Sequence, residues 1–391
     1  MSVPRGSEQP PSLLYIATVS ATLRHFLGPY ARHLRARGWR VDAAASGVTA
    51  DTVLRDAFDE AHEIPLSRSI VDVPAMILGY RAVARVLATQ PDIVHVHTPI
   101  ASFITRLAVR RMSADRRPAV VYTAHGFHFH RGGHWAANGL FLLVERLAGR
   151  WTDRLIVINE EDFAAAIRHR LVAAARIVRM PGIGLDTDVF DRSVIDPAAT
   201  AAAREAFGVP LTSALFVAVG ELNRNKRQAD IVAALAQMKN REARLILLGD
   251  GDARPVLEVL VAKLGLTDRV AFGGLVADVR PLLAGATALV HPSKREGLSR
   301  AVMEALALEV PVIASAARGN AELVGDDGVI VPIGDVAGLA RAMDRFASEP
   351  EAARALGRRA RPRIVERYDI RAIIARHVDL YDGLVAARRG R

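Results

Sequence analysis

The chain has 391 residues, a net charge of +10 and no cysteine. Its length predicts two domains or three, and a 51% hydrophobic content without a long polar run predicts a folded globular protein. The missing thiols exclude disulfides and thiolate metal sites and fit a reducing cytoplasm. The apolar runs are too short to cross a membrane, and residues 1–12 lack the core of a signal peptide, so we expect a disordered tail there.

Nearly all of the positive charge comes from arginine. A basic chain suits nucleic acid, an anionic membrane surface or a phosphorylated ligand. The arginines are spread along the chain, and no helix-turn-helix, zinc finger or aromatic RNA-binding motif is visible, so the sequence disfavours nucleic acid as a partner.

The first half of the chain alternates strand and helix patterns. We expect strands at 13–19, 41–45, 93–97, 120–123, 154–158 and 176–180, and helices at 26–37 and 73–88. This alternation predicts a parallel sheet covered by helices on both faces.

The segment 191–211 is rich in Ala, Asp and Pro and has no strand signal, so we place the inter-domain connection there. The alternation then restarts, with strands at 214–219, 244–248, 270–272, 288–291 and 312–315 and helices at 230–238, 255–264, 299–308, 338–346 and 352–368. We therefore predict an α/β fold of two Rossmann-like domains, 13–190 and 191–369, facing a cleft at the carboxyl ends of their strands. The C-terminal segment 370–391 is expected to pack back onto the first domain.

The turn after the first strand excludes one common class of Rossmann protein. A dinucleotide-dependent dehydrogenase carries G-x-G-x-x-G there, but the segment 17–26 contains no glycine. No Walker A sequence is present either. The domains thus lack both standard phosphate loops.

Two carboxylates eight positions apart form the strongest local pattern. Glu296 follows a predicted strand, and Glu304 lies on the predicted helix after it. The residues between them, Gly297, Leu298 and Ser299, would present backbone amides at a helix N-terminus, which suits a phosphate group. The alternative is a pair of solvated surface glutamates.

A polar segment follows the strand that opens the second domain. It contains Gly220, Asn223, Arg224, Asn225 and Lys226. A lysine at the carboxyl end of a parallel strand can neutralise a diphosphate leaving group. The alternative is an ordinary strand-to-helix turn with a solvated lysine.

Histidines and aromatic residues cluster at 123–130, after another strand. His125 suits acid/base chemistry or binding of sugar hydroxyls, and Phe127 lies two residues on. At least one of the three histidines there is expected to serve packing only. Asp250 and Asp252 form a D-x-D pattern, but a glycine turn explains it equally well, so we predict no metal site.

Together, these motifs resemble a known enzyme family. His95–Pro99 reads H-V-H-T-P, Tyr122–Phe129 reads Y-T-A-H-G-F-H-F, and Glu296 and Glu304 fit an E-x7-E motif. The segments 158–162, 181–186 and 220–226 match as well. The chain resembles the retaining glycosyltransferases of family 4, which have the GT-B fold, from Leu14 to Leu384. It is most similar to the branch that makes capsule, exopolysaccharide and lipid-linked oligosaccharides in bacteria.

The resemblance implies roles for individual residues. In the second domain, which would bind the nucleotide-sugar, Glu296 contacts the transferred sugar, Glu304 the ribose and Lys226 the diphosphate. His125 contacts the sugar near the reacting centre. Many family members carry Arg five residues before the lysine, where this chain has Glu221, so either Lys226 and backbone amides suffice or Arg224 substitutes. The remaining expected donor contacts are Gly220, Asn223, Asn225, Gly297, Leu298 and Ser299, and the expected acceptor contacts in the first domain are His25, Phe26, His97, Thr98 and Phe127.

The implied reaction is transfer of a hexose or N-acetylhexosamine from a nucleotide-diphosphate donor, with UDP favoured, to a glycan or polyprenyl-diphosphate-linked acceptor with retention. No cofactor is implied. The alternatives are a GT-B relative of another reaction class, such as a nucleotide-sugar epimerase, and a non-catalytic nucleotide-sugar binding protein.

A basic cluster begins on the first predicted helix with Arg32 and Arg35 and is followed by Arg37 and Arg40. These residues are either solvated side chains of an arginine-rich protein or contacts to an anionic membrane. The second interpretation predicts a cytoplasmic protein that is peripheral on the inner face of the plasma membrane.

Overall fold

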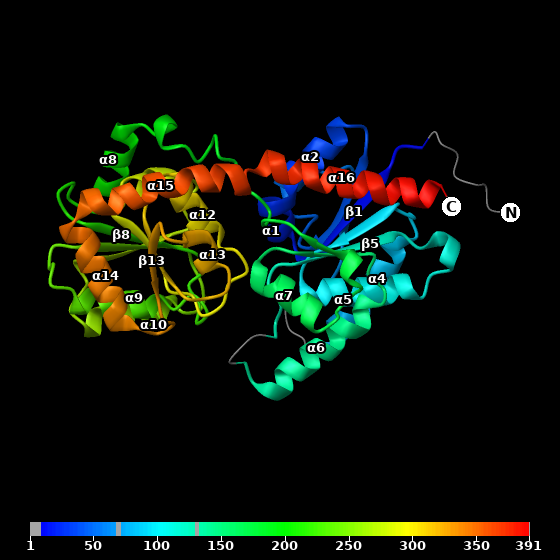
Figure 1. The fold of residues 1–391 in the computed structure, drawn as a ribbon, viewed down its shortest axis with the longest axis horizontal. Coiled ribbons are helices and arrows are strands. Elements are labelled where there is room, and N and C mark those ends of the chain that lie inside the picture. The colour runs from blue at the N-terminus through cyan, green and yellow to red at the C-terminus, as the bar shows by residue number, and fades with distance from the viewer. Residues whose placement is uncertain (1–8, 68–71, 130–132, 391) are drawn as a thin grey trace. The chain divides into compact units, whose positions relative to one another are not determined.

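The computed structural model describes residues 9–67, 72–129 and 133–390. The chain divides into unit 1, Met1–Ile183 with Arg371–Arg391, and unit 2, Gly184–Ile370. Each unit is a parallel sheet with helices on both faces (Figure 1), which confirms the predicted class of two Rossmann-like α/β domains. Most of the predicted tail, residues 1–8, lies outside the described residues, and Ser12 already belongs to the first strand.

The sheet of unit 1 has the strand order β3-β2-β1-β4-β5-β6-β7, and all neighbouring pairs are parallel. Its strands are β1 Ser12–Val19, β2 Arg40–Ser46, β3 Ala61–Glu63, β4 Ile93–Val96, β5 Ala119–Ala124, β6 Arg154–Val157 and β7 Ile177–Arg179. The longer helices of the unit are α2 Gly28–Ala36, α4 Val73–Leu87, α5 Pro99–Arg110, α6 Trp135–Gly149, α7 Glu160–Arg168 and α16 Ile370–Arg389. The short helices are α1 Ser20–Thr22, the π-helix η1 Leu23–Leu27, α3 Thr52–Arg55 and the 3-10 helices η2 Ala114–Arg116 and η3 Ala174–Arg176.

The sheet of unit 2 has the order β10-β9-β8-β11-β12-β13, again all parallel. Its strands are β8 Leu215–Val219, β9 Arg244–Leu248, β10 Val270–Gly274, β11 Ala288–His291, β12 Val312–Ser315 and β13 Gly328–Val331. The helices are α8 Pro197–Glu205, α9 Gln228–Gln237, α10 Arg254–Lys263, α11 Arg280–Ala284, α12 Arg300–Ala307, α13 Asn320–Val324, α14 Val336–Ser348 and α15 Pro350–Tyr368.

The core of unit 2 lies on both faces of its sheet. Along β8, Leu215 and Val217 belong to one buried cluster, while Phe216 and Ala218 belong to a second. Successive side chains of a strand point to opposite faces, so both faces are buried, as an all-parallel sheet requires. This burial explains why the strands read as short continuous apolar runs.

The segment predicted as an inter-domain connection, 191–211, lies inside unit 2 and contains α8. Asp196 caps this helix, its side chain accepting a hydrogen bond from the Ala198 amide at 2.8 Å, and Pro197 opens its first turn. The chain passes from unit 1 to unit 2 earlier, after Ile183. A capped Ala-rich helix thus stands where the composition indicated a linker.

The last helix, α16, begins at the end of unit 2, but residues from Arg371 onward belong to unit 1. Tyr381 of this helix is buried, and its hydroxyl lies 3.2 Å from that of Tyr15 on β1. The end of the chain therefore completes the core of the unit with which the chain begins.

Candidate active site

Two neighbouring strands of unit 2 carry the predicted donor residues to one edge of the sheet. β8 and β11 pair in parallel, so the loops that follow Val219 and His291 leave the same edge. There the Lys226 Nζ donates a hydrogen bond to Glu296 Oε1 at 2.7 Å. Two residues from separate motifs, 70 positions apart, thus form one ion pair.

The two loops also hold each other through their backbones. Asn225 Nδ2 donates to the Arg295 carbonyl at 2.9 Å, and the Lys294 amide donates to the Asn225 carbonyl at 2.7 Å. Within the first loop, Asn223 Oδ1 accepts from the amides of Asn225 and Lys226, each at 3.0 Å. The asparagines therefore set the loop that presents Lys226.

Glycine is required where this edge meets the next strand. A Cβ on Gly249 would lie 2.1 Å from the Gly220 carbonyl oxygen, a separation that real Cβ atoms do not show. Gly249 also has φ +131°, which side-chain-bearing residues rarely adopt. The close approach seats the 220–226 loop against the end of β9.

His291 completes the environment of Glu296. The His291 Nε2 lies 3.1 Å from Glu296 Oε1 and 3.0 Å from Ser293 Oγ. Burial lowers the pKa of His291, so the ring is neutral at pH 7. Burial alone would raise the pKa of Glu296, but the hydrogen bond from His291 and the ammonium of Lys226 outweigh it and hold that pKa below its ordinary value. Glu296 is therefore an ionised, oriented carboxylate.

Glu304 lies on α12, the helix that follows Glu296, and is buried. It is 7% exposed on α12, and Arg300 Nε donates to its Oε1 at 2.7 Å. Burial raises the pKa of this carboxyl group, against the pull of Arg300. Ser299 caps α12, with its hydroxyl accepting from the Val302 amide. A Cβ on Gly319 would lie 1.8 Å from the Gly297 carbonyl oxygen, so the loop before α13 fits closely against the start of α12.

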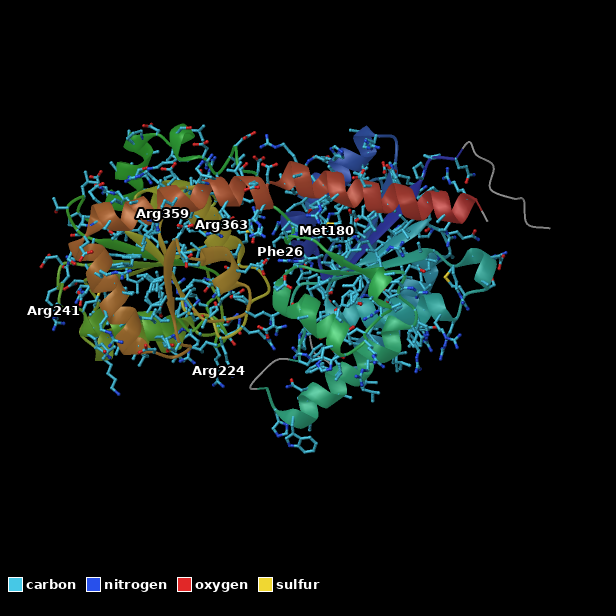
Figure 2. All side chains as sticks on the ribbon, viewed as in Figure 1. Phe26, Met180, Arg224, Arg241, Arg359 and Arg363 are labelled. Atoms are coloured by element: carbon cyan, nitrogen blue, oxygen red, sulfur yellow. The ribbon has the colours of Figure 1, made fainter. Side chains whose placement is uncertain are left out.

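Arg224 and Glu221 do not join this cluster. Both side chains are exposed, and Figure 2 shows Arg224 on the surface of unit 2. The Glu221 carbonyl accepts from Gln228 Nε2 at 3.0 Å, which is a structural contact of the loop. Of the basic residues in the 220–226 loop, Lys226 is the one that meets Glu296.

A histidine cluster lies at the corresponding edge of unit 1. His125 follows β5, and its Nε2 lies 3.1 Å from His97 Nδ1, just after β4. The rings of His97 and His95 lie 4.2 Å apart, centroid to centroid. Burial lowers the pKa of all three, that of His125 to about 4, so the rings are neutral at pH 7. A neutral His125 can accept a hydrogen bond from a hydroxyl group or donate one to it.

The cluster continues into the C-terminal helix. His95 Nδ1 lies 2.6 Å from the Tyr381 hydroxyl, and His95 Nε2 lies 2.8 Å from Thr123 Oγ1. His377 of the same helix is buried, and burial lowers its pKa to about 4. α16 therefore helps to fix the ring positions that end at His125.

Comparisons with known proteins identify the class. Residues 30–188 match the family described as Glycosyltransferase Family 4, and residues 200–363 match Glycosyl transferases group 1. The chain is 35% identical over 354 residues to EpsD of Bacillus subtilis (strain 168), which is named as a glycosyltransferase, covering 89% of this chain and 91% of EpsD. The chain belongs to glycosyltransferase family 4.

Two further relatives span most of the chain. An Escherichia coli UDP-Gal:alpha-D-GlcNAc-diphosphoundecaprenol alpha-1,3-galactosyltransferase is 26% identical over 323 residues, which is 81% of each chain. The crystal structure of HepE from Anabaena with UDP-glucose has a TM-score of 0.79 at 21% identity, covering 95% of this chain and 99% of HepE. The latter supports the GT-B fold predicted for this family 4 member.

The predicted acceptor residues of this family 4 chain have unequal surroundings. Phe127 is 2% exposed and stacks on Phe129 in the core, so its side chain offers no surface to an acceptor. His97 is buried as well and supports His125. Phe26 is partly exposed and stacks near His125, with ring centroids 6.4 Å apart. Thr98 Oγ1 lies 2.7 Å from Thr18 Oγ1, and the side chain of His25 lies outside the described residues.

The D-x-D pattern forms an ordinary turn. Asp250 Oδ1 accepts from the Gly251 amide at 2.9 Å, and Asp252 is exposed. Among the described residues, the group with metal-ligand geometry is Asp42, Glu60 and His62. Arg40 binds both of its carboxylates, at 3.1 and 2.9 Å, so the group is an ion-pair network.

His291 and Ser293 were not among the site residues predicted from the sequence. A histidine that ends the apolar strand A-L-V-H was the available signal, since a buried polar residue at a strand end needs a partner. Tyr381 was not predicted either, because its partners lie more than 280 positions away and leave no local signal.

The basic cluster at residues 32–40 is largely paired. Arg35 Nε lies 2.9 Å from Asp59, Arg37 lies 3.3 Å from Asp382, and Arg40 binds Asp42. These carboxylates neutralise the positive charges of Arg35, Arg37 and Arg40. Within the part of the chain that the structure describes, no helix combines the length and apolarity needed to span a bilayer.

Proposed function

We propose that this family 4 member transfers a hexose or N-acetylhexosamine from a UDP-sugar to a lipid-linked acceptor with retention of configuration, in the synthesis of a bacterial cell-surface polysaccharide. The observation that carries the proposal is the ion pair of Lys226 with Glu296, braced by His291 at the carboxyl ends of β8 and β11. An ammonium and an oriented carboxylate in contact suit a diphosphate and the sugar attached to it.

In this proposal, Lys226 neutralises the diphosphate as it leaves, Glu296 binds the transferred sugar and Glu304 binds the ribose. The bond between the anomeric carbon and the diphosphate oxygen breaks while the acceptor hydroxyl oxygen bonds to the same carbon. The hydroxyl proton passes to the departing phosphate oxygen. His125, neutral because burial lowers its pKa to about 4, hydrogen-bonds a sugar hydroxyl.

The lipid-linked acceptor is supported by the E. coli relative, whose printed substrate is a GlcNAc-diphosphoundecaprenol. The UDP donor is supported by that name and by the UDP-glucose complex of HepE. An acceptor of this kind resides in a membrane, so we also propose that the protein works as a peripheral protein on the inner face of the plasma membrane.

A donor screen tests the proposal. Thermal unfolding is recorded with UDP-, GDP- and dTDP-sugars, because a ligand that binds the folded state raises Tm. The stabilising donor is then incubated with undecaprenyl-diphosphate-linked GlcNAc, and the anomeric configuration of the product is read by NMR. A product of inverted configuration would contradict the proposed retention. Stabilisation by a donor other than a UDP-sugar would contradict the proposed nucleotide.

A further inference from the structure

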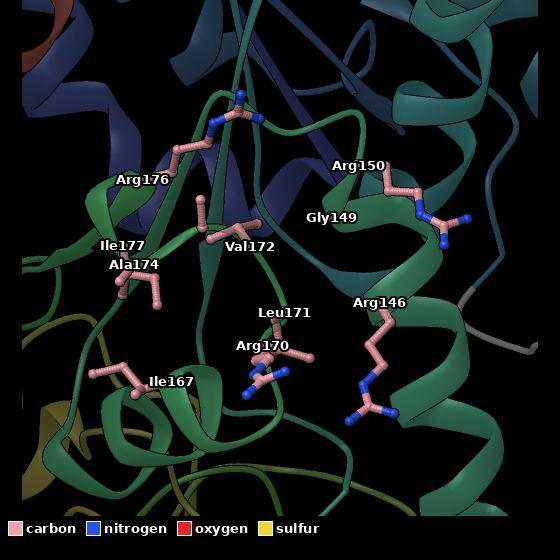
Figure 3. A pocket seen from close by; sticks show the side chains of 11 residues that line it. Arg146, Gly149, Arg150, Ile167, Arg170, Leu171, Val172, Ala174, Arg176 and Ile177 are labelled. Carbon is pink, nitrogen blue, oxygen red and sulfur yellow. The ribbon is translucent and has the colours of Figure 1, made fainter.

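Unit 1 has an arginine-lined pocket at the sheet edge opposite to His125. Its volume is about 730 Å³, and it lies between the end of α6, the loop after α7 and the start of β7 (Figure 3). β7 starts at Ile177, so the pocket lies at the amino ends of the strands, whereas His125 follows the carboxyl end of β5. The pocket is therefore separate from the candidate active site.

Four guanidinium groups border this pocket, from Arg146, Arg150, Arg170 and Arg176. Among the described residues, none of the four forms an ion pair with a carboxylate; Arg146 and Arg176 donate to the carbonyls of His169 and Thr152. All four are exposed. This surplus of unneutralised positive charge differs from the basic cluster at 32–40, where Arg35, Arg37 and Arg40 are paired.

The pocket walls are apolar between these arginines. Ile167, Leu171, Val172 and Ile177 line it. A Cβ on Gly149 would lie 1.9 Å from the Leu171 carbonyl oxygen, so glycine is required for the loop to approach the end of α6 this closely. Cationic rims with apolar walls match a ligand that is both anionic and apolar, and a free anion would leave the walls unused.

The helix that leads to the pocket carries an exposed apolar face. Leu140, Leu143 and Leu147 follow helical spacing on α6 and are 56%, 64% and 39% exposed, and Trp135 at its start is 82% exposed. The one acidic residue of α6, Glu145, is turned inward, where it binds Arg106 and Tyr122. The outward face thus combines leucines, a tryptophan and arginines without an acidic residue, which is typical of helices that lie in a membrane interface.

We propose that α6 and the pocket form the surface by which this protein binds anionic phospholipids, with the headgroup phosphate at Arg146 and Arg150 and the leucine face among the acyl chains. α6 starts soon after the loop that carries His125 and ends at the pocket. Its length of about 22 Å therefore reaches from the carboxyl ends of the strands to their amino ends. When lipid binds along α6, the sheet edge that carries His125 lies at the membrane surface. The inference builds on the membrane location proposed above, but vesicle binding needs no sugar transfer, so the two can fail separately.

The test is flotation with vesicles of phosphatidylcholine alone and with phosphatidylglycerol added, at low and high salt. We expect binding to the anionic vesicles at low salt and release at high salt. Arg146→Gln/Arg150→Gln should weaken binding roughly 30-fold, from the contribution of two basic residues near an anionic surface. Leu143→Ser/Leu147→Ser should weaken binding at low salt, because it removes apolar side chains from the face of α6.

The matched control is Lys239→Gln/Lys263→Gln, which removes the same charge from exposed positions of unit 2 and should bind like wild type. Far-UV circular dichroism and the Tm shift with UDP verify folding of each variant. Wild-type affinity of the arginine variant, or no binding of wild type to anionic vesicles, would overturn the proposal. The proposal would also be overturned if wild type is a dimer and the leucine variant is a monomer, since α6 would then pack against a second copy of the chain. If inorganic phosphate abolishes flotation at constant ionic strength, the pocket binds a soluble anion, and the proposal is overturned as well.

Discussion

At the scale of single residues, Glu296 is the carboxylate whose charge and position are most constrained. Glu296→Gln keeps the shape but removes the charge that Lys226 and His291 orient. We expect sugar transfer to fall on the order of 10²-fold or more, as for loss of one preorganised electrostatic contact. Steady-state kinetics with the identified donor measures this, with far-UV circular dichroism as the folding control. Near-normal turnover by a folded variant would remove Glu296 from the reaction.

Lys226 should act on the nucleotide itself. Lys226→Ala leaves Glu296 without its ammonium partner and removes the positive charge proposed to meet the diphosphate. We expect weaker binding of UDP in isothermal calorimetry, while Lys263→Ala, an exposed lysine of the same unit, should bind UDP like wild type. Equal UDP affinity of both variants would move the phosphate contact elsewhere, with Arg224 the next residue to test.

Asp250 and Asp252 should be dispensable as metal ligands. Asp250 already accepts from the Gly251 amide and lies 3.9 Å from Arg254, an arrangement that a turn explains. We expect full transfer activity in excess EDTA. Activity that disappears with EDTA and returns with Mn²⁺ or Mg²⁺ would instead make the two aspartates ligands.

At the scale of elements, the Tyr381 hydroxyl of α16 ties the helix to His95 and to Tyr15. Tyr381→Phe removes the partner of both groups and leaves two buried polar atoms unpaired. We expect the free energy of unfolding to fall by about 1–3 kcal/mol for each such atom, the usual penalty. Urea denaturation measures it. Tyr80→Phe is the control, because within the described residues the Tyr80 hydroxyl accepts from an exposed Arg111 at 3.5 Å. An equal loss in both variants would contradict the expected role of Tyr381.

Much of the fold could be predicted from short apolar strands such as 215–219 and 288–291, because strands buried on both faces have a distinctive composition. α8 was missed because its alanines and its Asp-Pro start also resemble a linker. The motifs predicted Lys226 and Glu296 after parallel strands, but not the ion pair between them. The partnership of Tyr381 with His95 could not be predicted either, since it depends on tertiary packing of the last helix.

At the scale of the whole molecule, three buried histidines of unit 1 and the half-buried His125 should make stability depend on pH. Burial lowers the pKa of His95, His97, His125 and His377 in the folded protein, to about 4 for the last two, whereas the unfolded chain titrates near 6.5. Between these values the unfolded state binds more protons, so the free energy of unfolding should fall as pH drops from 6.5 towards 4. Each unit of pKa difference corresponds to about 1.4 kcal/mol.

Urea denaturation at pH 7.5, 6.0 and 5.0 checks this dependence. His377→Gln should flatten the decline, because one buried titrating ring is removed, and His33→Gln on the exposed face of α2 should not. A free energy of unfolding that is constant from pH 7.5 to 5.0 would show that these rings are not buried neutral.

The return of α16 to unit 1 has a consequence for how the protein is made. A ribosome releases the chain from its first residue onward, and domains generally fold in that order. Here all of unit 2 has been released once Ile370 has emerged. The sheet of unit 1 is still incomplete at that point, because Tyr381 and His377 have not yet covered Tyr15 on β1 and His95 on β4. We expect the first unit to finish folding last. A chain that stops short of its final helix would then retain a folded unit 2 and an uncovered sheet in unit 1, a product that cellular proteases recognise. Loss of the codons for α16 should therefore lower protein abundance before it affects the reaction.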